Sequence, residues 1–104
     1  MHEKGKNGMI CGYEDDASLV INSNIFSKLP DWQTMHSHPK GDEYYIFLRG
    51  KGEMSVDDDI IPFVAGDVIL CEAGEKHKVT KIIEEIEMIV IRTNTDKKDR
   101  IDFE

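Results

Sequence analysis

Short apolar runs separated by turn-forming residues dominate the sequence from residue 17 to residue 93. The longest runs, Tyr44–Leu48 and Met88–Ile91, have the length of single strands. Clusters of glycine, proline and aspartate punctuate them at intervals of roughly 8–12 residues, which is typical of an all-β sandwich or barrel. The predicted strands are Ser18–Asn22, Asn24–Lys28, Trp32–His38, Glu43–Arg49, Glu53–Val56, Ile60–Val64, Asp67–Cys71, Lys76–Lys81 and Glu87–Thr93.

Helices are disfavoured along the whole chain. No window free of Gly and Pro keeps apolar residues at i, i+3, i+4 and i+7 over three turns. Lys81–Glu87 stays open between a short helical turn, a strand and a tight loop. The tail Asp96–Glu104 alternates charges around two apolar residues, so it is either a frayed end or a strand that pairs with a neighbouring subunit.

The chain is predicted to form one domain over residues 1–104. Its barrel core covers about residues 17–93, and residues 1–16 form a loosely held N-terminal arm with one short strand at Met9–Cys11. Three aspartates at Asp57–Asp59 lie between two predicted strands, so a solvated hairpin turn is favoured over a calcium loop, whose spaced ligands are missing.

Charge and composition narrow the possible partners. Thirteen Lys and Arg against twenty-one Asp and Glu give a formal net charge of −8, which argues against nucleic acid and against an anionic membrane surface. No apolar stretch reaches the roughly 18 residues of a membrane-spanning helix, and the N-terminus carries no apolar run of a secretion signal. Cys11 and Cys71 form no Cys-x-x-Cys pair, so we expect reduced thiols in a cytoplasmic protein.

The candidate chemistry lies in three of the four histidines. His36 and His38 are two residues apart on a predicted strand, where alternate side chains share one face. Glu43 follows a Pro- and Gly-containing turn, and His77 follows another turn later in the chain. Three imidazoles and a carboxylate suit one divalent first-row transition metal ion: Mn, Fe, Co, Ni, Cu or Zn. Scattered surface histidines are the alternative.

The spacing of the whole set resembles the cupin family. Its first motif, His-x-His, four residues, Glu, six residues, Gly, is matched from His36 to Gly50. Its second motif, Gly, five residues, Pro-x-Gly, two residues, His, is matched from Gly66 to His77, with Glu72 in place of Pro. Two further departures are Pro30 in place of Gly and Lys81 in place of Asn.

The resemblance implies a double-stranded β-helix, which is a small jelly-roll cupin barrel. It also implies that His36, His38, Glu43 and His77 are the metal ligands at one mouth of that barrel. A homodimer is expected by the same likeness.

Strand parity indicates what surrounds the ion. If Glu43 points into the barrel, so do Tyr45 and Phe47, which are then candidates for the wall of a substrate pocket, with plain core packing as the equal alternative. The opposite face, Tyr44, Ile46 and Leu48, is apolar and needs to be covered by the N-terminal strands or by a second subunit.

The barrel alone does not name a reaction. The first hypothesis is a metal-dependent isomerase, lyase or dioxygenase acting on a small organic molecule such as a sugar or sugar acid. The alternatives are a non-catalytic cupin that binds or senses a small ligand, and a purely structural barrel. No catalytic residue can be assigned; Tyr45, Glu72 and Glu75 are the polar groups that could take part in acid–base chemistry.

Overall fold

The computed structural model describes residues 10–11, 18–30 and 33–103, and all regular elements within them are β-strands. This confirms the predicted all-β class. Most of the predicted arm, residues 1–16, lies outside the described residues. The strands are β1 (Ile10–Cys11), β2 (Val20–Phe26), β3 (His36–Ser37), β4 (Glu43–Val56), β5 (Asp59–Val64), β6 (Val68–Cys71), β7 (His77–Arg92) and β8 (Ile101–Asp102). Among these residues, no helix is long and apolar enough to cross a membrane.

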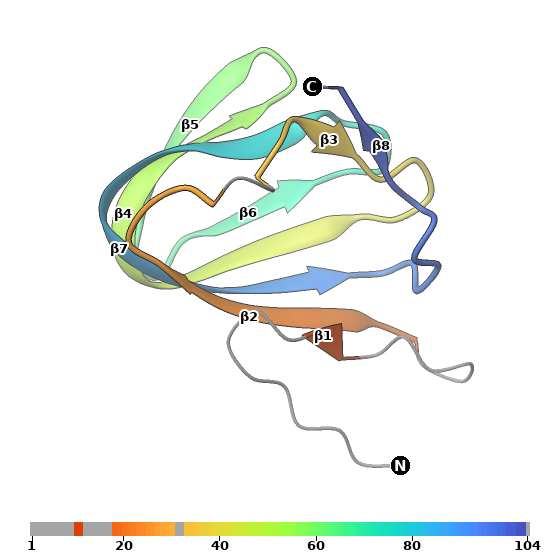
Figure 1. Cartoon of the computed structure of the whole chain (residues 1–104), viewed down its shortest axis with the longest axis horizontal. Helices are drawn as coiled ribbons and strands as arrows, with labels where there is room; N and C mark the ends of the chain where they lie inside the picture. The colour runs from red at the N-terminus through yellow and green to blue at the C-terminus, as the bar shows by residue number, and fades with distance from the viewer. Residues whose placement is uncertain (1–9, 12–17, 31–32, 104) are drawn as a thin grey trace.

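Two long strands, β4 and β7, form the frame of the barrel. They pair antiparallel from Glu43 opposite Arg92 to Val56 opposite His77, and both curve round at one end of the molecule (Figure 1). Because they curve, each of these two strands takes part in both β-layers of the barrel. The C-terminal half of β7 pairs with β2 and its N-terminal end pairs with β3, while β4 pairs with β6 through one half and with β5 through the other.

Glycines make this curvature possible, and here the predicted strand boundaries were wrong. Residues 50–52 separate the predicted strands Glu43–Arg49 and Glu53–Val56, yet in the structure they lie inside the single strand β4. Gly50 has a φ of +88°, and a Cβ atom there would overlap the carbonyl oxygen of Glu85 on β7. A Cβ atom on Gly52 would overlap the carbonyl oxygen of Lys81. The pairing of β4 with β7 shifts register at this point, so the glycines mark a bend and not a chain reversal.

The open question over Lys81–Glu87 is settled by the same pairing. The segment is the middle of β7 and contains no helical turn. The predicted hairpin at Asp57–Asp59 is also present, because Val56 pairs directly with Asp59 across a two-residue turn.

Inward-facing side chains of β4, β5 and β7 fill the barrel. Phe47 and Phe63 stack with ring centroids 3.7 Å apart and rings 9° from parallel, and Met54, Ile86 and Met88 surround them, all at most 2% exposed. Fully burying one such side chain contributes roughly 1.5–3 kcal/mol. The core therefore holds β4 against β7, close to the polar side chains of both strands that face into the barrel.

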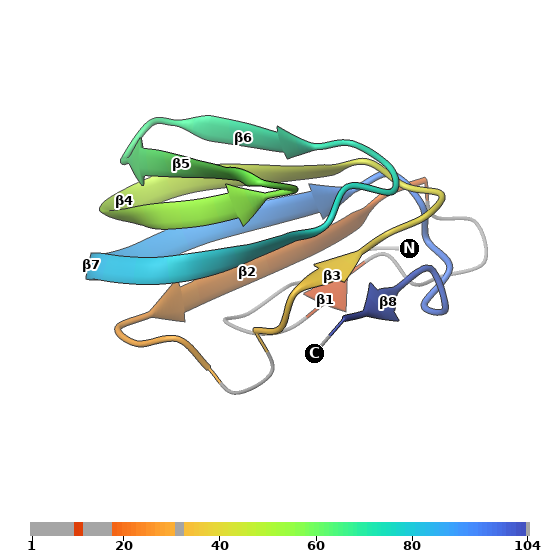
Figure 2. The same cartoon turned by 90° about the horizontal axis from the view of Figure 1, so that it is seen from above.

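Ile101 and Asp102 form β8, which pairs with β3 of the same chain, so this part of the tail is not a frayed end. Pairing of the tail with a neighbouring subunit stays a prediction. Asp102 is the register partner of His36, and Ile101 is the partner of Ser37. Figure 2 shows β8 beside β3 at the open edge of the barrel. The tail thus reaches a strand that carries predicted ligands.

Candidate metal centre

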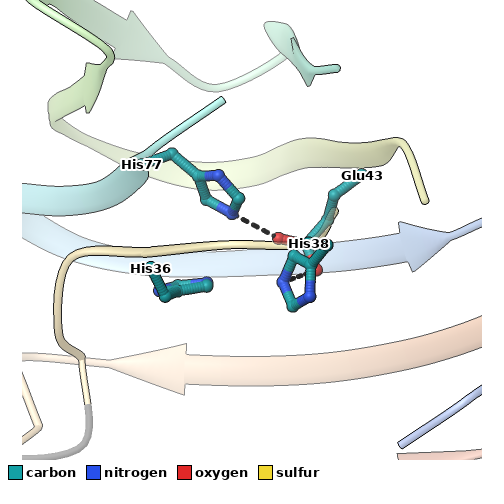
Figure 3. A group of neighbouring side chains, drawn as sticks. All are labelled: His36, His38, Glu43 and His77. Carbon is teal, nitrogen blue, oxygen red and sulfur yellow. Dashed lines mark hydrogen bonds and ion pairs between the residues drawn. The ribbon is translucent and has the colours of Figure 1, made fainter. Parts of the chain in front are cut away.

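The four predicted ligands come together inside the barrel. One nitrogen or oxygen from each of His36, His38, Glu43 and His77 lies within 4.8 Å of the others, and all four residues are buried (Figure 3). The fold brings them together through strand pairing, since His36 and His77 are register partners on β3 and β7. Glu43 begins β4, and its Oε1 and Oε2 atoms face His77 and His38.

His77 shows how closely the site fits a cation. Its Nδ1 atom lies 3.0 Å from the carbonyl oxygen of Glu75, and its Nε2 atom lies 2.8 Å from Oε1 of Glu43. Two lone pairs repel at such a distance, so either a proton or a metal ion must lie between Nε2 and Oε1. Because Nδ1 donates to the carbonyl, Nε2 is the nitrogen that is left to ligate.

His38 is oriented in the same way. Its Nδ1 atom lies 2.6 Å from the carbonyl oxygen of Asp99, which requires a proton on Nδ1. A guanidinium nitrogen of Arg92 lies 3.0 Å from the same Nδ1, but a protonated nitrogen cannot accept a hydrogen bond, so the shorter contact decides the tautomer. The buried Nε2 atom faces Glu43 Oε2 at 3.2 Å and is the nitrogen that is left to ligate. A metal ion would satisfy it.

His36 completes the set and is held neutral. Its Nδ1 atom lies 2.6 Å from the carbonyl oxygen of Thr34. Burial lowers the pKa of His36 from 6.5 to about 4, with help from the nearby positive charge on His77 and against the effect of the Thr34 hydrogen bond. At neutral pH the imidazole therefore keeps a free lone pair, as a metal ligand must.

Glu43 stays ionised although it is buried. Burial by itself would raise the pKa of Glu43, but the hydrogen bonds from His38 and His77, together with their charges, outweigh it and hold the pKa far below its usual value. The centre therefore offers one carboxylate and three imidazole nitrogens. This set could hold a divalent transition metal, and the donors alone do not select which one.

Comparison with known proteins places the chain in a family. The sequence profile of the family described as "Cupin domain" matches residues 30–92, which is more than half of the chain. The chain belongs to the cupin domain family. A comparison with curated proteins gives no match.

Solved structures with the same fold include other cupins. A cupin protein from Bacteroides fragilis is 19% identical with a TM-score of 0.71, over 93% of this chain and 86% of that one. A conserved double-stranded β-helix protein from Klebsiella pneumoniae is 13% identical with a TM-score of 0.74, over 100% and 89%. The DMSP lyase from Ruegeria pomeroyi is 19% identical with a TM-score of 0.67, over 81% of this chain but 42% of that one. These likenesses confirm the double-stranded β-helix.

The two predicted pocket residues of this cupin domain lie at different depths. Tyr45 packs against the centre, with its ring centroid 5.7 Å from that of His77, whereas Phe47 is 0% exposed within the aromatic stack of the core. Phe47 therefore fills the core in this structure. Burial, and then the negative charge of Glu43, raise the pKa of Tyr45 well above 10, so its phenol stays protonated.

The other predicted acid–base groups lie on the loop before β7. Glu72 is exposed, and the Glu75 carboxylate accepts a hydrogen bond from the Glu72 backbone N–H at 2.6 Å. Cys71, which pairs with Glu43 across the strands, is not a thiolate, because burial and then that carboxylate raise the pKa of its thiol.

Two charged residues beside the cupin centre were missed by the sequence reasoning. Arg92 is 6% exposed, with its Nε atom 3.9 Å from Glu43 Oε2, and Asp99 is 4% exposed behind His38. Arg92 could have been found, because it continues the inward parity of Met88 and Val90 at the end of an apolar strand. Asp99 gives no such signal, since it lies in a polar tail without periodicity.

Proposed function

We propose that this cupin domain binds one divalent first-row transition metal ion, Mn, Fe, Co, Ni, Cu or Zn, through His36, His38, Glu43 and His77. The observation that carries the proposal is the convergence of their ligand atoms within 4.8 Å, with a backbone carbonyl behind each imidazole. When bound, such an ion supplies a Lewis acid or a centre for oxygen chemistry. The chain's own contribution is to bury four donors and to direct one ligand atom of each into the centre.

We further propose that the domain is a metal-dependent enzyme acting on a small organic acid, such as a sugar acid, as an isomerase, lyase or dioxygenase. Charge supports an acidic substrate. Glu43, Asp99 and Arg92 are the buried charges around the centre, and together with a divalent ion they sum to +1. A carboxylate can neutralise that charge, and the Arg92 guanidinium lies beside the ligands, with its Nε atom 3.9 Å from Glu43 Oε2. The likeness to a DMSP lyase is compatible with lyase chemistry on this fold.

The alternative is a cupin that binds or senses a small ligand without reaction, and Tyr45 favours it. Tyr45 is the polar side chain packed against the His77 ring, and its raised pKa makes it a hydrogen-bond donor and a poor base at neutral pH. A donor of this kind orients a ligand, but it does not abstract a proton from one.

Replacing Glu43 by Gln tests the site and separates the two functions. The change keeps the size and one acceptor oxygen but removes the only carboxylate among the ligands. Metal affinity should fall at least ~10-fold yet remain measurable, because three imidazoles remain. Glu84→Gln is the matched control, since it removes the same charge from an exposed position.

The measurements are elemental analysis of protein purified without added metal, followed by a screen of sugar acids at saturating metal with occupancy recorded beside the rate. An enzyme should lose far more turnover than occupancy in Glu43→Gln. A binding protein should show ligand affinity that follows occupancy and no reaction in either form. Full occupancy and full activity in Glu43→Gln would contradict the proposed site.

We also propose that the domain forms a homodimer through the outer face of its sheet. Tyr44 pairs with Leu70 and Ile46 with Val68 across β4 and β6, and the side chains of Tyr44, Leu70 and Val68 are 36%, 40% and 57% exposed. A contiguous apolar face of this kind marks an interaction surface. The cytoplasmic location stays a prediction from the sequence.

A further inference from the structure

The C-terminal segment Asp99–Phe103 lies outside the residues matched by the family profile, yet it contacts the segments that carry the ligands. We propose that this segment, here called the C-terminal strap, is a positioning element of the metal centre: it fixes the orientation of His36 and His38, so strap docking and metal binding strengthen each other. The proposal rests on the proposed metal site.

The contact with His38 is the most direct. The carbonyl oxygen of Asp99 lies 2.6 Å from His38 Nδ1 and thereby fixes both the tautomer and the plane of the ring. A metal-ligating imidazole commonly depends on such a partner for its other nitrogen, and losing the partner typically costs 10–100-fold in affinity. In this chain the partner is supplied by a residue 61 positions away in sequence.

The strap is itself anchored at the turn between β3 and β4. The Asp99 carboxylate accepts a hydrogen bond from the Lys40 backbone N–H at 2.8 Å. The chain after β7 also packs closely against this turn, since a Cβ atom on Gly41 would lie 2.7 Å from Asn94 Cβ and 3.2 Å from Asp99 Oδ2. Asn94 and Asp99 therefore both pack directly against Gly41, between His38 and Glu43. The anchor couples the strap to two ligand-bearing segments at once.

The outer end of the strap holds His36 through its strand. Phe103 donates its backbone N–H to the carbonyl oxygen of Met35 at 2.9 Å, and Asp102 accepts a hydrogen bond from the Thr34 hydroxyl at 2.8 Å. Thr34 is the residue whose carbonyl accepts from His36 Nδ1. The ring of Phe103 also lies under the ammonium group of Lys76, 4.4 Å from its centroid, next to His77.

Two kinds of variant test the strap. The first ends the chain after Lys98, which removes the Asp99 carbonyl and β8 together. The second compares Phe103→Pro with Phe103→Ala: both lose the aromatic ring, but only proline loses the N–H that bonds to Met35. Because the alanine variant is the matched control, this pair keeps the test decisive even if the shortened chain does not fold.

Cobalt(II) is the probe, since its visible absorption reports coordination, and a competing chelator gives its affinity. We expect the shortened chain to bind ~10–100-fold more weakly and with an altered visible spectrum, while its far-UV circular dichroism stays that of the barrel. Phe103→Pro should bind more weakly than Phe103→Ala and shift the spectrum in the same direction. A merely structural tail would lower the unfolding temperature without changing the cobalt spectrum.

Reciprocity gives an independent readout. If the docked strap strengthens metal binding by a given factor, saturating metal must stabilise the docked strap by the same factor. Hydrogen exchange of the Phe103 amide, measured with and without cobalt, should therefore slow by about the factor that truncation costs in affinity. If the full-length protein binds no cobalt, the metal site itself fails, and the strap proposal with it. If full-length and shortened chains bind equally, the metal site stands and the strap proposal alone is overturned.

Discussion

Acid should destabilise the metal-free protein through the buried His36 side chain. Burial, chiefly, lowers the pKa of His36 to about 4, whereas the unfolded chain has the ordinary value of 6.5. Between these two values the unfolded state holds a proton that the folded state does not. The unfolding free energy therefore falls as the pH drops from about 6.5 to about 4, and it rises again with pH over the same window.

The magnitude follows from the width of that window. His36 is only 4% exposed, so the shift needs no discount for solvent screening. Lowering the pH from 7 to 5 should cost about 2 kcal/mol through this one residue, and the full shift amounts to about 3 kcal/mol near pH 4. Glu43 acts in the same direction but lower: because its pKa is depressed, its contribution is present above about 4.5 and is lost as the pH falls below that value. A comparison at pH 5 therefore leaves out most of the Glu43 contribution.

The assay is urea unfolding, followed by far-UV circular dichroism after chelator treatment, at pH 7 and pH 5. His36→Gln is compared with the unchanged protein, because glutamine keeps a hydrogen-bonding group but cannot titrate. The unchanged protein should lose about 2 kcal/mol more than the variant between the two pH values. Equal losses would show that His36 is not held neutral in the folded state and would refute the reasoning.

Three further expectations follow from the same structure. Bound metal should be released as the pH falls towards about 4, where the His36 imidazole takes up a proton, and retention at about pH 3 in equilibrium dialysis would mean that histidines are not the main ligands. Gly50→Ala should destabilise the barrel by about 2 kcal/mol or more in urea unfolding, because a Cβ atom there would overlap the Glu85 carbonyl oxygen. Gly66→Ala should cost less, because Gly66 has a similar φ of +96° but no neighbouring atom within 4 Å. Leu70→Glu should convert the proposed dimer into monomers by light scattering, and an unchanged mass would place the interface elsewhere.

Much of the ligand set could be predicted because its signals are local or fixed by spacing. The two-residue step from His36 to His38 and the turn before Glu43 can be seen in the sequence, and strand parity correctly divided β4 into the buried Tyr45 and Phe47 and the exposed Tyr44 and Leu48. Parity says which way a side chain points but not how deep it lies. It therefore could not separate Phe47, packed in the core, from Tyr45, packed against His77.

The bends of the long strands could not be predicted, because a glycine pair looks alike in a turn and in a bulge. What distinguishes Gly50 and Gly52 is that the carbonyl groups of Glu85 and Lys81 pass close by, and this contact exists only once β7 has folded onto β4. The same holds for β8. Its pairing with β3 joins residues more than sixty positions apart, and a short polar tail has no periodicity from which the strand could be predicted.

The orientation of the ligands is the feature that is hardest to predict from the sequence, because main-chain atoms set it. Three carbonyl groups, those of Thr34, Glu75 and Asp99, each accept from the Nδ1 atom of one imidazole and leave Nε2 for the ion. A carbonyl is present whatever the side chain, so no residue type marks these positions. What matters is where the backbone runs, and two of the three carbonyls lie two residues before their own histidine, where the local strand geometry places them. The third comes from the far end of the chain and depends on the whole path of the strap. For this reason His38 is the ligand whose geometry is most sensitive to changes elsewhere in the molecule, although the residues around it in the sequence match the family motif without a gap.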